Sequence, residues 1–163
     1  MLKATTASVL ALLALSSGLA ARAAEHPLWG LYAQLAEGTW RSQLSTGETS
    51  LARYRWIAPY QVLRAEHRLE GAPFTAEETI TLGPQPGRLL IVTQENDRAE
   101  PTRSEVTLRP DGSAVETFIG PTGNPERATY TPLDGDHYSA RTEARIGGAW
   151  REIWSSQISR VRE

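Results

Sequence analysis

Apolar and polar residues alternate along most of this chain, from Thr39 almost to its end. The alternating runs are separated by short stretches rich in Gly, Pro, Asn and Asp. Because successive side chains of a strand point to opposite faces, this pattern predicts β-strands joined by tight turns. We predict strands at Thr39–Ser45, Glu48–Ile57, Tyr60–Glu70, Phe74–Leu82, Arg88–Glu95, Arg103–Arg109, Ser113–Ile119, Arg127–Thr131, His137–Ile146 and Trp150–Val161.

A short apolar segment, Pro27–Ala36, precedes these strands and has a helical period. Pro27 suits the first turn of a helix, and we expect Gly38 to end it. The apolar residues at helical spacing are Leu28, Leu31, Tyr32 and Leu35. No crossover helix separates the strands, so we predict an all-β fold. It is a single antiparallel up-and-down β-barrel of about ten strands, with the short N-terminal helix closing one end.

The beginning of the chain has the features of a signal peptide. Lys3 provides a positive charge, Ala7–Leu15 is a short apolar run, and Ala21-Arg22-Ala23 places small residues at a cleavage site. We expect residues 1–23 to be removed after Ala23 and residues 24–163 to form one barrel domain, periplasmic or secreted. The chain has no Cys, so we expect no lipid anchor.

Composition excludes several classes of function. The formal net charge is −2, and removal of Lys3 and Arg22 makes the chain more acidic, so we expect no affinity for nucleic acid. The absence of Cys excludes thiolate catalysis and thiolate metal sites. Lys3 is the only lysine, which excludes Schiff-base chemistry in the processed chain. We therefore expect no cofactor.

The first candidate site is a pair of residues inside the barrel. On Tyr60–Glu70, His67 shares its face with apolar residues, which places the imidazole inside. Pairing across the turn Gly71-Ala72-Pro73 sets Glu78 opposite Ala65, and hence diagonal to His67. The pair could be a general base with its orienting partner, or could anchor a polar ligand group. The alternative is a His–carboxylate pair that only satisfies itself.

The second candidate lies on the last strand, where Trp150, Glu152 and Trp154 share one face that we expect to point inward. Desolvation there would raise the pKa of Glu152 and make it a proton donor or an anchor for an amine or hydroxyl. The alternative is an ion pair with Arg160 or another arginine near the end of the barrel.

Large aromatic side chains form a third set, suited to walls around a flat or apolar ligand. The alternative is that they fill the core. These residues are Tyr54, Trp56, Phe74, Tyr138 and Trp150. The three histidines, His26, His67 and His137, are scattered along the chain without the spacing of metal ligands. We therefore expect no dedicated metal site.

The segment Gly38-Thr39-Trp40, following a short helix, resembles the start of calycin-type barrels, the lipocalins and their relatives. In that family the Trp packs across the closed end beneath an Arg from the end of the barrel. The resemblance therefore implies that Gly38, Trp40 and Arg160 form the barrel closure, with Arg160 over the indole.

The middle of the chain resembles the uncharacterised exported lipocalin-like domains of bacteria. The matching segments are Trp56-Ile57-Ala58-Pro59 and Gly123-Asn124-Pro125, the latter followed by Tyr130. The strand number is closer to ten-stranded barrels such as nitrobindins and fatty-acid-binding proteins. However, Trp40 is followed by Arg41-Ser42-Gln43-Leu44, which departs from the extended glycine motif of nitrobindins.

Three functions remain open from the sequence. The first is an exported barrel that binds a small apolar or amphipathic molecule in its lumen, with Tyr54, Trp56 and Phe74 as walls. The second is an isomerase, cyclase or hydrolase of the same shape, using His67 with Glu78 or Glu152. The third is an interaction module with a packed core. Neither the ligand nor the oligomeric state follows from the residues.

Overall fold

The computed structural model describes residues 28–162, so the expected signal peptide and His26 lie outside the described residues. A short helix, α2 (Leu31–Leu35), precedes the strands. These are β1 (Gly38–Leu44), β2 (Thr49–Ala58), β3 (Val62–Leu69), β4 (Thr75–Leu82), β5 (Arg88–Glu95), β6 (Thr102–Leu108), β7 (Ala114–Ile119), β8 (Pro125–Pro132), β9 (His137–Ile146) and β10 (Ala149–Arg160).

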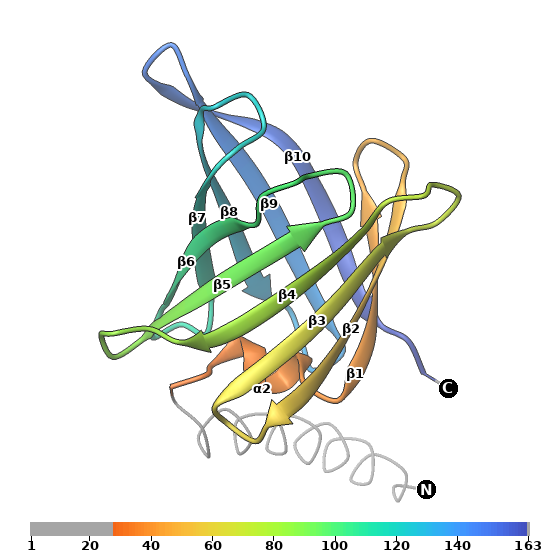
Figure 1. Ribbon diagram of the computed structural model, residues 1–163, viewed down its shortest axis with the longest axis vertical. Coiled ribbons are helices and arrows are strands. Elements are labelled where there is room, and N and C mark those ends of the chain that lie inside the picture. The colour runs from red at the N-terminus through yellow and green to blue at the C-terminus, as the bar shows by residue number, and fades with distance from the viewer. Residues whose placement is uncertain (1–27, 163) are drawn as a thin grey trace, which may run out of the picture.

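All neighbouring strands are antiparallel and consecutive in sequence, and β10 pairs with β1 to close the barrel (Figure 1). The predicted ten-stranded up-and-down barrel is therefore confirmed. Closure leaves no edge strand with unpaired backbone groups. Within residues 28–162, no helix is long and apolar enough to cross a membrane.

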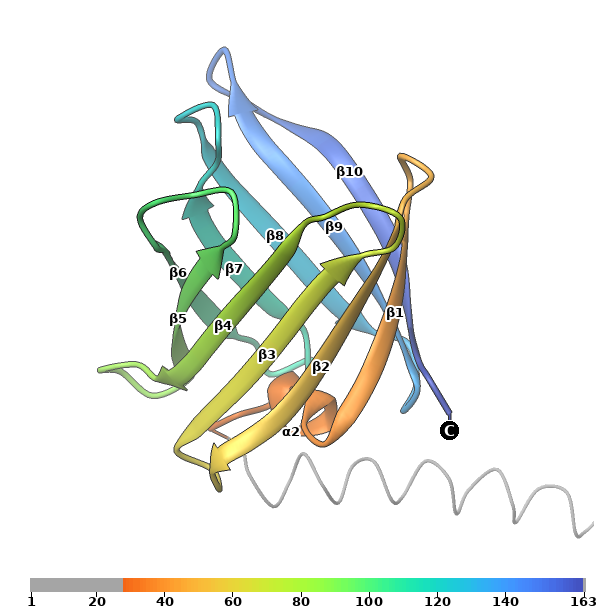
Figure 2. The same cartoon turned by 45° about the vertical axis from the view of Figure 1, so that its right-hand side comes forward.

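The helix α2 lies across one end of the barrel. The opposite end carries hairpin loops and none of the described helices, and we call it the open end (Figures 1 and 2). The helix residues Leu31, Tyr32 and Leu35 are buried against apolar side chains from the ends of the strands. Together they form a packed floor. The other buried residues of this floor are Trp29, Trp40, Leu63, Ile80, Leu89, Val106 and Tyr138.

Gly38 has a different role from the helix terminator that we expected. The helix has ended by Ala36, the residue with a positive φ is Glu37, and Gly38 is already the first residue of β1. A Cβ at Gly38 would lie 2.6 Å from a guanidinium nitrogen of Arg160 and 2.9 Å from Nε1 of Trp40. The position thus requires glycine because the two side chains occupy the space, not because of its backbone angle.

The side chains of β3 point inward and outward as expected. Leu63 and Ala65 are fully buried, whereas Arg64 and Glu66 form ion pairs on the outer surface with Glu77 and Arg55, respectively. The same holds for β9, where Tyr138, Ala140, Thr142 and Ala144 are buried inside.

In the first half of β10, the side chains that we expected to face inward face outward. The register between β10 and β9 shifts between Glu152 and Trp154, so that Ile153 is an extra residue. Trp154 pairs with the inward-facing Thr142, but Glu152 pairs with the outward-facing Glu143. The predicted inward direction of Glu152 and Trp150 is therefore wrong.

Contacts on the outer wall agree with this correction. The carboxylate of Glu152 lies 3.0 Å from Nε of Arg141, and the guanidinium of Arg127 lies 4.4 Å from the ring centre of Trp150. The bulge thus gives the carboxylate an arginine partner in water, where an unpaired carboxylate inside the barrel would have been costly.

Candidate ligand-binding site in the barrel lumen

A polar cluster lies inside the barrel, on strands from both halves of the sheet. In one half, Glu78 of β4 pairs with Ala65, and His67 is its diagonal neighbour on β3. Nε2 of His67 lies 3.2 Å from Oε2 of Glu78, and the two side chains keep 21% and 19% of their surface exposed. They are thus enclosed by the barrel but still reachable from the lumen. The ring of Tyr54 stands edge-on to the imidazole, with centroids 5.9 Å apart.

Nε2 of His67 lies close to Glu78 but lacks the geometry of a hydrogen bond. This nitrogen is buried and has no hydrogen-bond partner among the described residues. A buried polar atom without a partner is uncommon, because its desolvation is then uncompensated. The close Glu78 carboxylate compensates part of this cost as an ion pair when His67 is protonated, and a polar group bound beside the pair could compensate the rest.

The second half of the cluster is centred on Glu116 of β7. Ser104 of β6 donates a hydrogen bond of 2.5 Å to Oε1 of Glu116, and the hydroxyl of Tyr130 on β8 donates one of 2.9 Å to Oε2. The register explains both contacts. Val106 pairs with Glu116 and Ala114 pairs with Tyr130, so Ser104 and Tyr130 are the diagonal neighbours of Glu116 on either side.

Electrostatics link the two halves. Burial raises the pKa of Glu116, and the Glu78 carboxylate raises it further; the hydrogen bonds from Ser104 and Tyr130 oppose the shift. Burial lowers the pKa of His67, but the charge of Glu78 and its contact with the imidazole outweigh this, and the net pKa is raised. The Glu78 carboxylate therefore acts on Glu116 as a like charge, and His67, when protonated, acts on it as the opposite charge.

Phenol groups surround these carboxylates. Burial, followed by the charges of Glu116 and Glu78, raises the pKa of Tyr32, Tyr54 and Tyr130 well above its ordinary value. All three side chains thus keep their protons at neutral pH and serve as hydrogen-bond donors.

A cavity of about 560 Å³ has His67, Ala52 and Ala76 in its lining. The other residues that line it alternate with these along β1–β4, so their side chains face the outside of the barrel. They include exposed arginine and glutamate residues. Glu78, Ser104, Glu116 and Tyr130 do not line it. The side-chain contacts, rather than this cavity, therefore define the polar cluster.

The structure separates the sequence-predicted site residues into three groups. It brings Tyr54, His67 and Glu78 together inside the barrel. Phe74 precedes β4 at the open end and is half-buried there. The other candidates do not reach the cluster: Trp56 packs on Trp29 and Tyr138 on Trp40 in the floor, while Trp150 and Glu152 lie outside.

Sequence reasoning missed Glu116, Ser104 and Tyr130 as site residues. Ser113–Ile119 has apolar residues in both phases, so its faces could not be assigned, and Ser104 had no visible partner. The usable signal was the turn Pro110-Asp111-Gly112, which fixes the β6–β7 hairpin and thereby brings Ser104 near Glu116.

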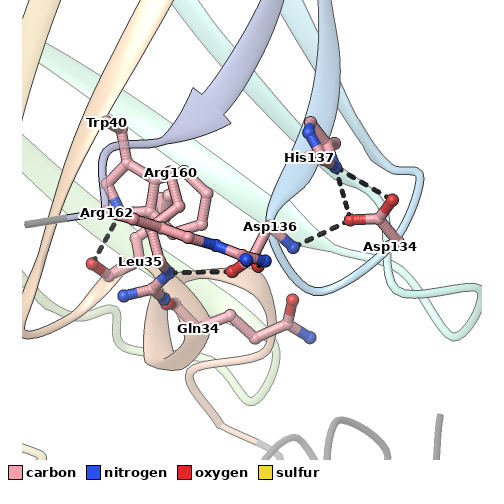
Figure 3. A network of polar contacts seen from close by, with 8 residues as sticks. All are labelled: Gln34, Leu35, Trp40, Asp134, Asp136, His137, Arg160 and Arg162. Carbon is pink, nitrogen blue, oxygen red and sulfur yellow. Dashed lines mark hydrogen bonds and ion pairs between the residues drawn. The ribbon is translucent and has the colours of Figure 1, made fainter. Parts of the chain in front are cut away.

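Metal binding finds no support in the described residues, which contain no group of three or more His, Asp or Glu side chains arranged to hold an ion. His137 instead contacts Asp134, with Nδ1 2.8 Å from Oδ1 (Figure 3).

Comparisons with known proteins support the fold. One similar solved structure is that of Rv2717c from M. tuberculosis, with a TM-score of 0.57 and 13% sequence identity over 83% of this chain and 98% of that one. Another, EF1p2_mFAP2b bound to DFHBI, covers 82% of this chain and 99% of its own at 13% identity, but its TM-score of 0.39 is too low to bear on this chain.

No family model matches the sequence. No curated protein matches it either. The likeness to Rv2717c supports the closed antiparallel barrel and indicates nothing about the ligand.

Proposed function

We propose that this chain is an exported barrel that binds a small amphipathic molecule in its lumen. The ligand enters at the open end, and its polar group contacts the cluster of His67, Glu78 and Glu116. The observation that supports this most directly is the buried Nε2 of His67, which lacks a hydrogen-bond partner although the side chain is reachable from the lumen.

The sizes of the inward-facing side chains also support a ligand. A barrel of this strand number is wider than one that side chains fill completely. Above the floor, many inward positions carry small residues: Ser42, Ala52, Ala76, Thr93, Ala128, Ala140 and Ala144. Such residues leave space beside the polar cluster, and a molecule in this space would be surrounded by protein on all sides but one.

A binding experiment with a neutral fluorescent probe tests this function. We expect N-phenyl-1-naphthylamine to bind residues 24–163 saturably, with increased fluorescence. The variant Ala76→Trp fills an inward position of β4 and should weaken binding by about tenfold or more. Thr79→Trp, on the exposed outer phase of the same strand, is the matched control and should bind as the unchanged protein does.

Thermal unfolding of both variants establishes that they fold, and Ala52→Phe on β2 is a second blocking variant. Absence of saturable binding, or binding that Ala76→Trp and Ala52→Phe leave unchanged, would overturn the proposal of a lumen ligand. Export is tested separately by expressing the full chain in a bacterial host. Mass spectrometry of the periplasmic fraction should find a protein that starts at Ala24, and recovery of the uncleaved chain in the cytoplasm would contradict export.

A further inference from the structure

The charges that face the interior of the barrel are unevenly distributed. The inward positions above the floor carry four carboxylates and one imidazole, that of His67. Glu78 and Glu116 belong to the polar cluster, whereas Glu126 and Glu95 lie nearer the rim, where Glu95 is paired with Arg98. Inward-facing arginines occur only at the two ends in the described strands. Arg160 is held in the floor over Trp40, and Arg151 is exposed near the open end. The central lumen is therefore acidic.

The hydrogen-bonding capacity of this region is also unevenly distributed. Each oxygen of Glu116 accepts one hydrogen bond, from Ser104 or Tyr130, and each can accept a second. Glu78 contacts His67 through Oε2 only. Ser104 and Tyr130 are thus already directed at the carboxylate of Glu116, while acceptor positions remain on both carboxylates. A ligand group with several donors would fit this arrangement better than one with several acceptors.

Two buried hydroxyl groups extend the acceptor surface. Glu116 pairs with Ala128, which pairs with Thr142; one row below, Tyr130 pairs with Ala140, which pairs with Ser156. Thr142 and Ser156 are 0% and 5% exposed, and their side-chain oxygens have no hydrogen-bond partner among the described residues. Two alanines thus separate Glu116 and Tyr130 from two further inward-facing oxygens.

We propose that the polar group recognised in this lumen is a protonated amine, held between Glu78 and Glu116, and that an amphipathic carboxylate is excluded. This inference rests on the proposed function and names the class of its ligand. An ammonium group carries three donors and a positive charge, which match the free acceptor positions and offset the repulsion between the two carboxylates. A carboxylate at the same place would bring a third negative charge into an enclosed, poorly solvated region.

The raised pKa of Glu116 agrees with a carboxyl group that lacks a full counter-charge. His67 supplies part of this charge, and a bound ammonium would supply the rest. Besides burial, the groups that act on the pKa of Glu116 are Glu78, Ser104, Tyr130 and His67.

Displacement of the neutral probe by three molecules with the same alkyl chain tests the inference. Dodecylamine, dodecan-1-ol and sodium dodecanoate are each titrated below their micelle concentrations into the complex of residues 24–163 with N-phenyl-1-naphthylamine at pH 7. We expect dodecylamine to displace the probe at a concentration lower by about tenfold or more than dodecanoate, with the alcohol between them.

Variants locate the preference. Glu116→Gln and Glu78→Gln should each reduce the preference for the amine over the alcohol by about tenfold, with the affinity for the probe measured separately for each variant. Glu105→Gln, on the outer phase of β6 beside Arg88, is the matched control and should keep the preference. If one of these two variants fails to fold, the other still tests the amine site, together with the order in which the three molecules displace the probe from the unchanged protein.

The outcomes separate this inference from the proposed function. Equal or better displacement by dodecanoate, or an amine preference that survives both glutamate substitutions, would overturn the amine site while leaving a lumen binder. Failure of the probe itself to bind would remove the proposed function, and the amine site with it.

Discussion

The guanidinium carbon of Arg160 lies 4.3 Å from the centre of the Trp40 indole ring, at the closed end of the barrel (Figure 3). The same guanidinium donates a hydrogen bond of 2.6 Å to the carbonyl of Gln34, and its Nε lies 3.3 Å from a carboxylate oxygen of Asp136. The indole Nε1 in turn donates to the carbonyl of Leu35. Arg160 and Trp40 therefore hold the end of α2, the first strand and the β8–β9 turn together.

Removal of this arginine should destabilise the fold. In Arg160→Ala the contact with the Trp40 ring, the hydrogen bond to Gln34 and the ion pair with Asp136 are lost together. We expect the free energy of unfolding to fall by about 2–3 kcal/mol, measured by urea denaturation. Arg162→Ala is the control, because Arg162 contacts the same Asp136 from an exposed position, and a surface ion pair contributes about 0–1 kcal/mol. Equal effects of both substitutions would contradict the importance of the stacking on Trp40.

Substitution of Gly38 tests the space beneath the guanidinium. In Gly38→Ala the new methyl group would meet Arg160 at 2.6 Å and Trp40 Nε1 at 2.9 Å, which should cost about 1–3 kcal/mol of stability. Because part of this clash is with Arg160, the cost should be smaller when Gly38→Ala is introduced into Arg160→Ala. A double-mutant cycle by urea denaturation measures the coupling. Strictly additive effects would show that the backbone, and not the side chain of Arg160, accommodates the methyl group.

Glu116 should make stability depend on pH. Its pKa is raised in the folded protein from the ordinary value of 4.5, so folding favours the protonated carboxyl. Its stabilising contribution is complete below pH 4.5 and is lost as pH rises through the raised pKa. Glu116→Gln removes this dependence. We therefore expect the unfolding free energy of the variant, relative to that of the unchanged protein, to increase between pH 4.5 and pH 8. The measurement is urea denaturation across this range, with the exposed Glu100→Gln as control. A constant difference across the range would contradict the shift.

The bulge at Ile153 predicts different effects for two tryptophans of β10. Trp154 faces inward beside Thr142, whereas Trp150 stacks on Arg127 outside. Trp154→Ala should change the affinity for N-phenyl-1-naphthylamine, because it alters the lumen wall. Trp150→Ala and Glu152→Gln should leave this affinity within about twofold of that of the unchanged protein. A loss of binding in either of these two variants would mean that the outer wall takes part in binding.

The sequence predicts the architecture well because alternation and turns are local signals. The turn Gly71-Ala72-Pro73 sets Glu78 opposite Ala65, and the structure has this register. By contrast, the alternation of β7, which carries Glu116, is hidden by apolar residues on both faces, and the partners of Glu116 come from the two neighbouring strands. Their contacts follow from register, not from any pattern within one strand.

The bulge in β10 cannot be recognised from the sequence, for a different reason. In sequence, Trp150, Glu152 and Trp154 have a regular period of two, and nothing local indicates that Ile153 is an extra residue. What places Glu152 outside is the register shift against β9, which pairs it with the outward-facing Glu143. The pairing between strands thus overrides the alternation within one strand, and a regular period of two extends the wrong direction to the end of the hairpin.

The alanines on the inner wall have a consequence for how this barrel changes over evolutionary time. The floor fixes the fold through large, closely packed side chains, while several inward positions of the upper wall carry alanines that a single nucleotide change can enlarge to valine or threonine. Each such change would alter the shape of the lumen by a few atoms and leave the floor intact. Ligand preference in barrels of this design can therefore diverge quickly between descendants that keep the same architecture.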